Sequence, residues 1–261
     1  MCLGVMPSNR YELALVMPVY NEEGCIAAVV DSWRAELEVC GIDFVLIVID
    51  DGSRDRTARI LADYADDERI RVSRQTNDGH GPAVLRGYRQ AVAVADWVFQ
   101  CDSDDEMRPD SFQSLWKLRD EADAVFGCRQ HRRQGLQRRL ISLCSRVTME
   151  KLYGRGIEDA NTPYRLMRSS VLEPIIACIP PRTAAPNVIV SGALIVAAAR
   201  IRNVPVPCLP RQTGRGSMVR WRLWKTAIRS FGQTLRCSRQ IRRVPLRQQH
   251  AAETLAAPRE R

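Results

Sequence analysis

The sequence predicts an α/β fold with a central, mostly parallel sheet flanked by helices, of the Rossmann-like kind. Two observations lead to this prediction. Segments such as residues 44–49 (FVLIVI) are apolar at every position, which is typical of parallel strands buried on both faces. Between such segments lie stretches such as residues 22–39, where apolar side chains recur every three or four positions, as on one face of a helix.

Strands and helices are expected to alternate along the first half of the chain. The expected strands cover residues 13–17, 44–49, 70–72, 97–101 and 124–128. The expected helices cover residues 22–39, 55–66 and 111–121, together with one that Gly79, Gly81 and Pro82 introduce and that ends near Val94.

The second half of the chain has a looser pattern. We expect a basic helix over residues 134–152 and an edge strand over residues 164–167. The apolar run over residues 187–200 is ambiguous, but its length favours a helix. A last strand is expected over residues 201–206, where Pro205 and Pro207 cut it off.

Charge is unevenly distributed along the chain, whose formal net charge is +9. No Asp or Glu occurs between Glu173 and Glu253, a stretch that contains fourteen Lys or Arg residues. Such a stretch favours an acidic partner, namely phosphate, anionic lipid or nucleic acid, although a general enrichment in Arg and Ala explains much of it.

Cysteine usage and hydropathy indicate the compartment. The nine cysteines are scattered and never spaced C-x-x-C, so we expect free thiols in a reducing cytosol rather than a zinc site or disulfides. The first ten residues lack the apolar core of a signal peptide. The longest apolar run, residues 188–199, is shorter than the roughly 20 residues that span a bilayer. We therefore expect a cytoplasmic chain that does not cross a membrane.

Polar clusters follow three of the expected strands. They are residues 18–22 (PVYNE), 50–53 (DDGS) and 102–106 (DSDDE). Open parallel sheets bind ligands outside the carboxyl ends of their strands. We therefore expect the three clusters to converge at one edge of the sheet.

The third cluster has the chemistry of a metal site. Asp102 and Asp104 form D-x-D, with Asp105 and Glu106 adjacent, and so much negative charge in one loop favours a cation that bridges a diphosphate. An isolated D-x-D is more often a solvated turn, but the position directly after an apolar strand favours the metal site.

The second cluster suits a nucleotide, because a carboxylate there accepts hydrogen bonds from a ribose hydroxyl or a base N–H. The sequence lacks G-x-G-x-x-G and G-x-x-x-x-G-K-[ST], which disfavours a dehydrogenase and a P-loop NTPase. A nucleotidyltransferase would need a glycine- and lysine-rich loop near the N-terminus, which is also missing.

The three clusters, in this order and at these spacings, resemble glycosyltransferase family 2, which has the GT-A fold. Within it the chain is similar to the polyprenyl-phosphate hexosyltransferases, such as the dolichyl-phosphate mannose synthases. The resemblance runs from about Leu13 to Met218. Its further motifs are N-x-G-x-G-x-A at 77–83, GCR at 127–129, DANTPYRL at 159–166 and RQTGRGS at 211–217.

The resemblance implies a role for individual residues. A divalent cation, Mg²⁺ or Mn²⁺, would be held by Asp104 and Glu106. His80 stands where Lys or Arg is common, and we expect it to be a loop residue rather than a base. The nucleotide sugar would be bound by Pro18, Tyr20, Glu22, Val48, Asp50, Asp102 and Ser103, and phosphates by Arg129, Arg139 and Arg211; Asp159 and Arg165 fall in the acceptor-side motif.

The implied reaction is an inverting displacement on a UDP- or GDP-sugar. A polyprenyl-phosphate acceptor is already an anion and needs no general base. An alcohol on a soluble glycan or small molecule would need a carboxylate to take its proton, either Asp105 or Asp159. The residues expected to act in catalysis are Asp104, Asp105, Asp159, Arg129 and Arg211. A nucleic-acid-binding protein is a remote alternative that leaves the acidic clusters unexplained, so no nucleic acid partner is expected.

The C-terminal part completes the expected organisation: a GT-A catalytic domain over residues 1–217, a basic amphipathic helical segment over 218–247, and a disordered tail over 248–261. Apolar side chains recur at helical spacing among the arginines of the middle segment, at Trp221, Trp224, Ile228, Phe231 and Leu235. This pattern is typical of a helix that lies on anionic lipid, and it is equally compatible with packing on the catalytic domain. We expect peripheral contact with the cytoplasmic face of a membrane.

Overall fold

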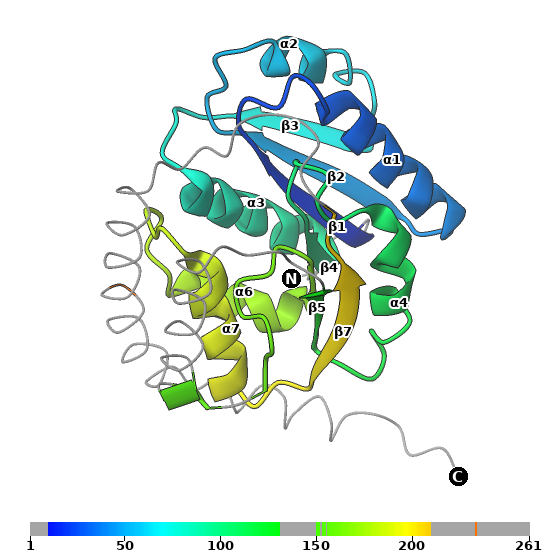
Figure 1. Cartoon of the computed structure of the whole chain (residues 1–261). Coiled ribbons are helices and arrows are strands. Elements are labelled where there is room, and N and C mark those ends of the chain that lie inside the picture. Colours follow the sequence, from blue (N-terminus) through cyan, green and yellow to red (C-terminus); the bar gives the residue numbers. More distant parts are fainter. Residues whose placement is uncertain (1–9, 131–149, 152, 155, 210–232, 234–261) are drawn as a thin grey trace, which may run out of the picture.

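The protein is described by a computed structural model, which covers residues 10–130, 150, 151, 153, 154, 156–209 and 233. Its centre is a seven-stranded sheet with the order β3-β2-β1-β4-β6-β5-β7 (Figure 1). The strands are β1 (Tyr11–Val19), β2 (Phe44–Asp50), β3 (Ile70–Arg74), β4 (Ala95–Gln100), β5 (Ala124–Gln130), β6 (Arg165–Arg168) and β7 (Ile201–Pro207).

Most neighbouring strands run parallel. β1 pairs in parallel with both β2 and β4, β2 with β3, and β5 with β7. β6 is antiparallel to β4 and to β5. The predicted α/β fold with a mostly parallel sheet is confirmed.

Helices cover both faces of the sheet (Figure 1). α1 (Ile26–Val39) and α4 (Phe112–Trp116) pack on one face, and the short α2 (Thr57–Ala62) lies beside α1. α3 (His80–Val94), α6 (Ser169–Ala177) and α7 (Pro186–Val196) pack on the other face. A short 3-10 helix, η1 (Pro109–Ser111), precedes α4.

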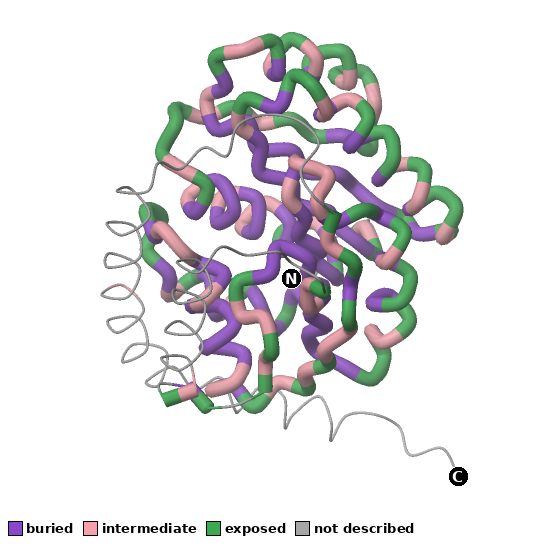
Figure 2. Tube along the Cα trace, in the orientation of Figure 1, coloured by how far each residue is buried: buried purple, intermediate pink, exposed green. Residues whose placement is uncertain are grey.

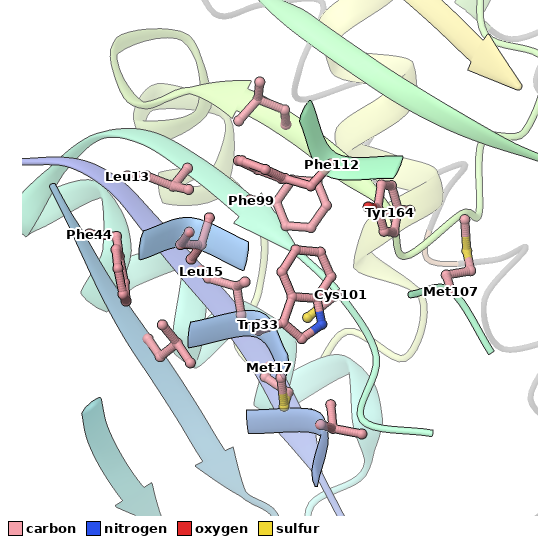
Figure 3. Packing of buried hydrophobic residues seen from close by; sticks show 14 of the residues in the cluster. Leu13, Leu15, Met17, Trp33, Phe44, Phe99, Cys101, Met107, Phe112 and Tyr164 are labelled. Carbon is pink, nitrogen blue, oxygen red and sulfur yellow. The ribbon is translucent and has the colours of Figure 1, made fainter. Parts of the chain in front are cut away.

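Alternate side chains of each central strand enter the two cores, because successive residues of a strand point to opposite faces. Figure 2 shows a largely buried interior, which contains the central strands, whereas the edge strands β3 and β7 carry mostly exposed and half-buried residues. On the α1 side, the ring of Trp33 lies 5.2 Å from that of Phe99, and Phe99 lies 4.8 Å from Tyr164 (Figure 3). This aromatic cluster packs α1 against β4, the central strand of the sheet.

Three sequence expectations need correction. Residues 164–167 were expected at an edge, but β6 lies between β4 and β5, which is why its apolar side chains are fully buried. The strand expected over residues 201–206 was to be cut off by Pro205 and Pro207, but β7 includes both prolines, since it lies at one edge of the sheet and needs no ladder donor on its open side. No element was expected at α6, which forms with Pro174 inside it.

The expected helix over 111–121 is shorter than predicted, and α4 ends at Trp116. Most of the expected helix over 134–152 and of the segments 218–247 and 248–261 lies outside the described residues, so the domain boundaries stay predictions. Among the helices of the part that the structure describes, none has the length and apolar character needed to cross a bilayer.

Candidate active site at the carboxyl edge of the sheet

The three polar clusters meet at one edge of the sheet. β2, β1 and β4 are parallel neighbours, so the segments that follow them emerge side by side. The backbone N–H of Asn21 donates to Ser53 Oγ at 3.0 Å, which joins the first cluster to the second. Cys25 follows the first cluster, and its thiol lies 3.5 Å from Glu22 Oε2 and 3.4 Å from the carbonyl oxygen of Ser103, which links the first cluster to the third. The predicted convergence is present in the structure.

Asp50 ends β2 as a buried carboxylate that is only 1% exposed. Its Oδ1 accepts the backbone N–H of Ser53 at 2.8 Å, whereas its buried Oδ2 accepts no hydrogen bond. That Oδ2 lies 3.3 Å from Nε of Arg74, whose side chain is 61% exposed. Asp50 therefore has one buried oxygen that accepts no hydrogen bond, with a cationic neighbour.

Arg74 was missed by the sequence analysis. It is the last residue of β3, so the argument that ligand-binding residues follow the carboxyl ends of strands applies to it as well. The guanidinium donates to the carbonyl oxygen of Ser53 at 2.9 Å, which holds it over the second cluster.

The second carboxylate of the DDGS cluster, Asp51, organises the loop that precedes α3. Its Oδ1 accepts the Gln75 side-chain amide at 2.8 Å and the Asp78 backbone N–H at 3.0 Å, and its Oδ2 accepts the Gly79 N–H at 2.9 Å. Asp51 is 3% exposed. It fixes the loop from which the N-terminus of α3 begins.

The acidic loop after β4 lies next to that N-terminus. Oδ1 of Asp102 is buried without a hydrogen-bond partner and lies 3.9 Å from Nε2 of His80, the first residue of α3. Burial raises the pKa of Asp102, and Asp104 adds to this, whereas His80 and Arg129 act in the opposite direction. His80 was expected to be a loop residue, but it is the first residue of α3 and lies beside the acidic loop.

The acidic loop offers an incomplete set of metal ligands. Asp104 and Glu106 are half-buried, and the Glu106 N–H donates to Asp104 Oδ1 at 3.2 Å. Within the described residues, no three His, Cys, Asp or Glu side chains are grouped so that they could hold a metal by themselves. Mg²⁺ and Mn²⁺ prefer carboxylate oxygens and take their other ligands from waters and substrate phosphates. The carboxylates of this loop, with an orphaned oxygen on Asp102, fit a metal of that kind.

Two arginine–carboxylate pairs lie close to the acidic loop. Arg129 donates to both oxygens of Asp159, from Nε at 2.7 Å and from Nη2 at 2.9 Å, and the two side chains are only 13% and 23% exposed. Asp105 has a left-handed backbone, with φ of 57°, and its Oδ2 lies 3.4 Å from Nη2 of Arg108. Both carboxylates that were candidates for a general base are ion-paired with arginine.

Arg165 is fully buried and holds the acceptor-side motif in place. Its guanidinium donates to the carbonyl oxygens of Ala160, Thr162 and Asn187, and to Ser191 Oγ. Burial lowers its pKa. This buried arginine therefore holds the backbone of residues 160–162 in place.

The other expected ligand-binding residues differ in accessibility. Tyr20 is half-buried at the edge, while Glu22 and Ser103 are buried beside Cys25. Val48 is 0% exposed and packs in the core, so it supports the site and does not line it. Pro18 is likewise buried within β1, and Arg139 and Arg211 lie outside the described residues.

Comparisons with known sequences agree with this geometry. The model of "Glycosyl transferase family 2" matches residues 14–176. An undecaprenyl-phosphate 4-deoxy-4-formamido-L-arabinose transferase of Pectobacterium atrosepticum is 28% identical over 170 residues, which are 64% of this chain and 51% of that protein. The protein of the same name from Pseudomonas paraeruginosa is 29% identical, over 64% of this chain and 50% of its own length. The chain spans about half the length of the curated relatives it matches.

Solved structures establish the fold. Glucosyl-3-phosphoglycerate synthase from Mycobacterium tuberculosis, in complex with Mn²⁺, UDP-glucose and phosphoglyceric acid, has a TM-score of 0.65 at 17% identity, over 87% of this chain and 80% of that one. S. aureus TarS in complex with UDP has a TM-score of 0.56 at 21% identity, over 76% and 60% of the two chains. The predicted GT-A fold is confirmed. Because the family match covers more than half of the sequence, the chain belongs to glycosyl transferase family 2.

Proposed function

We propose that the chain is an inverting glycosyltransferase that moves a hexose from a UDP- or GDP-sugar to a polyprenyl phosphate. The observation that carries this proposal is the convergence of Asp50, Asp102 and Asp104 at one edge of the sheet, beside the Arg129–Asp159 pair. One sheet edge thereby presents acceptors for a nucleoside, carboxylates for a diphosphate-bound metal, and a cation for phosphate. The named activity of the undecaprenyl-phosphate relatives supports the same assignment.

Asp50 and Arg74 would hold the base. Oδ2 of Asp50 is a hydrogen-bond acceptor that accepts no hydrogen bond in this structure, and the Arg74 guanidinium beside it can donate to a base carbonyl. Uracil and guanine each place a ring N–H next to a carbonyl oxygen, which complements this pair, whereas cytosine and adenine lack the ring N–H. The pair therefore favours UDP- and GDP-sugars over their CDP and ADP counterparts.

Asp104 and Glu106 would hold a divalent cation, Mg²⁺ or Mn²⁺. When bound, the ion offsets the negative charge that develops on the departing nucleoside diphosphate. Asp102 and Ser103, directly after β4, would orient the nucleotide against it. Arg129 remains beside Asp102 as a fixed positive charge for phosphate, held in one orientation by both oxygens of Asp159.

The state of the two candidate bases favours a phosphate acceptor over an alcohol. An alcohol must lose its proton, but Asp159 accepts two hydrogen bonds from Arg129, and Asp105 is paired with Arg108. A lipid phosphate attacks as an anion and needs neither carboxylate as a base. Catalysis then consists of positioning and charge stabilisation.

The acceptor lipid requires contact with a membrane. We assign that contact to the basic segment 218–247, lying on the anionic cytoplasmic face. The relatives are named for transfer of an arabinose derivative, a pentose, so a test of donors includes pentose as well as hexose nucleotides.

The test is a donor screen with the full chain, labelled UDP- and GDP-sugars, Mg²⁺ or Mn²⁺, and polyprenyl phosphate in detergent. The proposal predicts label that partitions into organic solvent, and loss of transfer in Asp104→Asn with an unchanged thermal midpoint. Asp66→Asn, which removes an exposed carboxylate on another part of the surface, is the matched control and should retain transfer. Label that never partitions into organic solvent would contradict the lipid acceptor, and full transfer by Asp104→Asn would contradict the metal assignment.

A further inference from the structure

A concave feature lies on the outer face of α3, and none of the residues that line it belongs to the acidic loop. It has a volume of about 410 Å³ and is bounded by α3, the loop between β3 and α3, and the loop between α6 and α7. Pro82, Arg86 and Arg89 share one face of α3, as their spacing of three or four residues requires. Asp78 and Arg182 line the other two walls. We call this feature the α3 groove.

The α3 groove has an excess of positive charge, with three arginines against the single carboxylate of Asp78. Nη1 of Arg86 donates to the Arg74 carbonyl oxygen at 3.4 Å, and Nη2 of Arg89 donates to that of Ile179 at 3.0 Å. Nη2 of Arg182 lies 3.9 Å from Asp78, and its side chain is 80% exposed. Each guanidinium carries five N–H donors, so these contacts leave most of them for a ligand. The chemistry of the groove is that of an anion site, and arginine suits phosphate in particular.

The walls of the groove are fixed to one another. A Cβ at Gly81 would lie 2.2 Å from the carbonyl oxygen of Thr183, so the first turn of α3 is in direct contact with the α6–α7 loop. The Thr183 hydroxyl donates to the Pro180 carbonyl oxygen at 2.8 Å, which closes that loop on itself. With the Arg89 contact to Ile179, two points of α3 hold this wall, so the walls of the groove are fixed relative to each other before any ligand arrives.

The neighbourhood of the groove indicates which anion it meets. Gln233 lies against the α6–α7 wall, where its Oε1 accepts the Ala184 N–H at 3.0 Å and its Nε2 donates to the Arg182 carbonyl oxygen at 3.4 Å. In the sequence Gln233 belongs to residues 218–247, which contain nine Lys or Arg and no Asp or Glu. One wall of the groove therefore contacts a residue of the most basic segment of the sequence, and arginines in the groove together with that segment match an extended anionic surface better than a single small anion.

We propose that the α3 groove binds the phosphate of an anionic phospholipid headgroup and thereby sets the orientation of the catalytic body on a membrane. The assignment rests on the groove and the Gln233 contacts, and does not depend on the transferase function.

The experiment measures binding of the full chain to phosphatidylcholine vesicles with and without phosphatidylglycerol, at fixed ionic strength. Arg86→Gln combined with Arg182→Gln removes two charges from the groove. An Arg near an anionic surface contributes about fivefold, so the double variant should bind the anionic vesicles about 30-fold more weakly. Arg59→Gln with Arg202→Gln removes two exposed charges elsewhere and is the matched control.

The proposal predicts only a small loss of binding to anionic vesicles for the control double variant, and unchanged thermal midpoints for both double variants. It also predicts slower amide exchange over residues 82–90 and 179–183 on anionic vesicles. Equal losses of vesicle binding in the two double variants, or no loss in the groove double variant, would overturn the proposal. A third arm uses soluble glycerol phosphate: full competition at concentrations close to those of the lipid would assign the groove to free phosphate esters and overturn the lipid headgroup.

Discussion

Asp51 is the residue whose replacement tests the architecture of the site most sharply. It contacts no proposed ligand, yet it accepts three hydrogen bonds from residues 75–79, the loop that leads into α3 and His80. Asp51→Asn keeps the shape of the side chain and removes its charge. It also replaces one acceptor oxygen with an NH₂ group, which then faces a backbone N–H.

The magnitude follows from these contacts. Hydrogen bonds to a charged group contribute about 1.5–3 kcal/mol each, and Asn retains one acceptor oxygen, so one or two of the three bonds are lost. With the side chain 3% exposed, water does not replace them. We expect Asp51→Asn to lower the free energy of unfolding by about 3 kcal/mol, which corresponds to a fall in Tm of about 6–12 °C for a chain of this size.

Two measurements check this prediction. Thermal unfolding should show the fall in Tm for Asp51→Asn and almost none for Asp66→Asn, whose carboxylate is exposed. Donor titration should show a raised KM, because the loosened loop adjoins Asp102 through His80. A Tm within about 2 °C of the parent together with an unchanged KM would refute the role of Asp51 as the organiser of this loop.

Three further predictions concern contacts around the site. In a double-mutant cycle of Arg129→Gln and Asp159→Asn, the coupling in unfolding free energy should be about 2–3 kcal/mol, since the pair is mostly buried; coupling below about 0.5 kcal/mol would contradict the bidentate pair. Alkylation of Cys25 by N-ethylmaleimide should abolish donor binding, and bound UDP or GDP should slow the alkylation. Cys25→Ser is the resistant control. Full donor binding after alkylation would show that this thiol does not lie at the ligand-binding edge. Gly81→Ala should cost about 3 kcal/mol through the clash with Thr183, and unchanged stability would mean that α3 does not contact the α6–α7 loop.

Strong local patterns made the first half of the fold predictable. Residues 44–49 are apolar at every position, and β2 occupies them with one added residue, Asp50. The edge at which the clusters meet follows from the parallel order of the strands alone. By contrast, β6 has four residues and an antiparallel direction, and its place between β4 and β5 depends on pairings across the chain that no local pattern encodes.

The parts of the candidate site whose role depends on residue type could be predicted from the sequence. The parts whose role depends on contacts in the folded chain could not. The acidic loop and Asp50 stand out because carboxylates after apolar strands are unusual. Asp51 has the same residue type as its neighbour, but its hydrogen bonds make it a support for the loop. The pairing of Arg129 with Asp159 joins positions thirty residues apart. Only the folded chain shows that the Arg129 guanidinium binds the carboxylate of Asp159, which was a candidate general base.

The central claim is that Asp50 and Asp104 act on one nucleoside diphosphate at one edge of the sheet. Calorimetric titration of the full chain with UDP and GDP, with and without Mn²⁺, tests it most directly. We predict that Mn²⁺ strengthens binding to the parent chain, that Asp104→Asn removes this metal-dependent gain but keeps the metal-free affinity, and that Asp50→Asn weakens binding under both conditions. An Asp104→Asn variant that retains the full gain from Mn²⁺, or an Asp50→Asn variant that binds as the parent does, would contradict the claim.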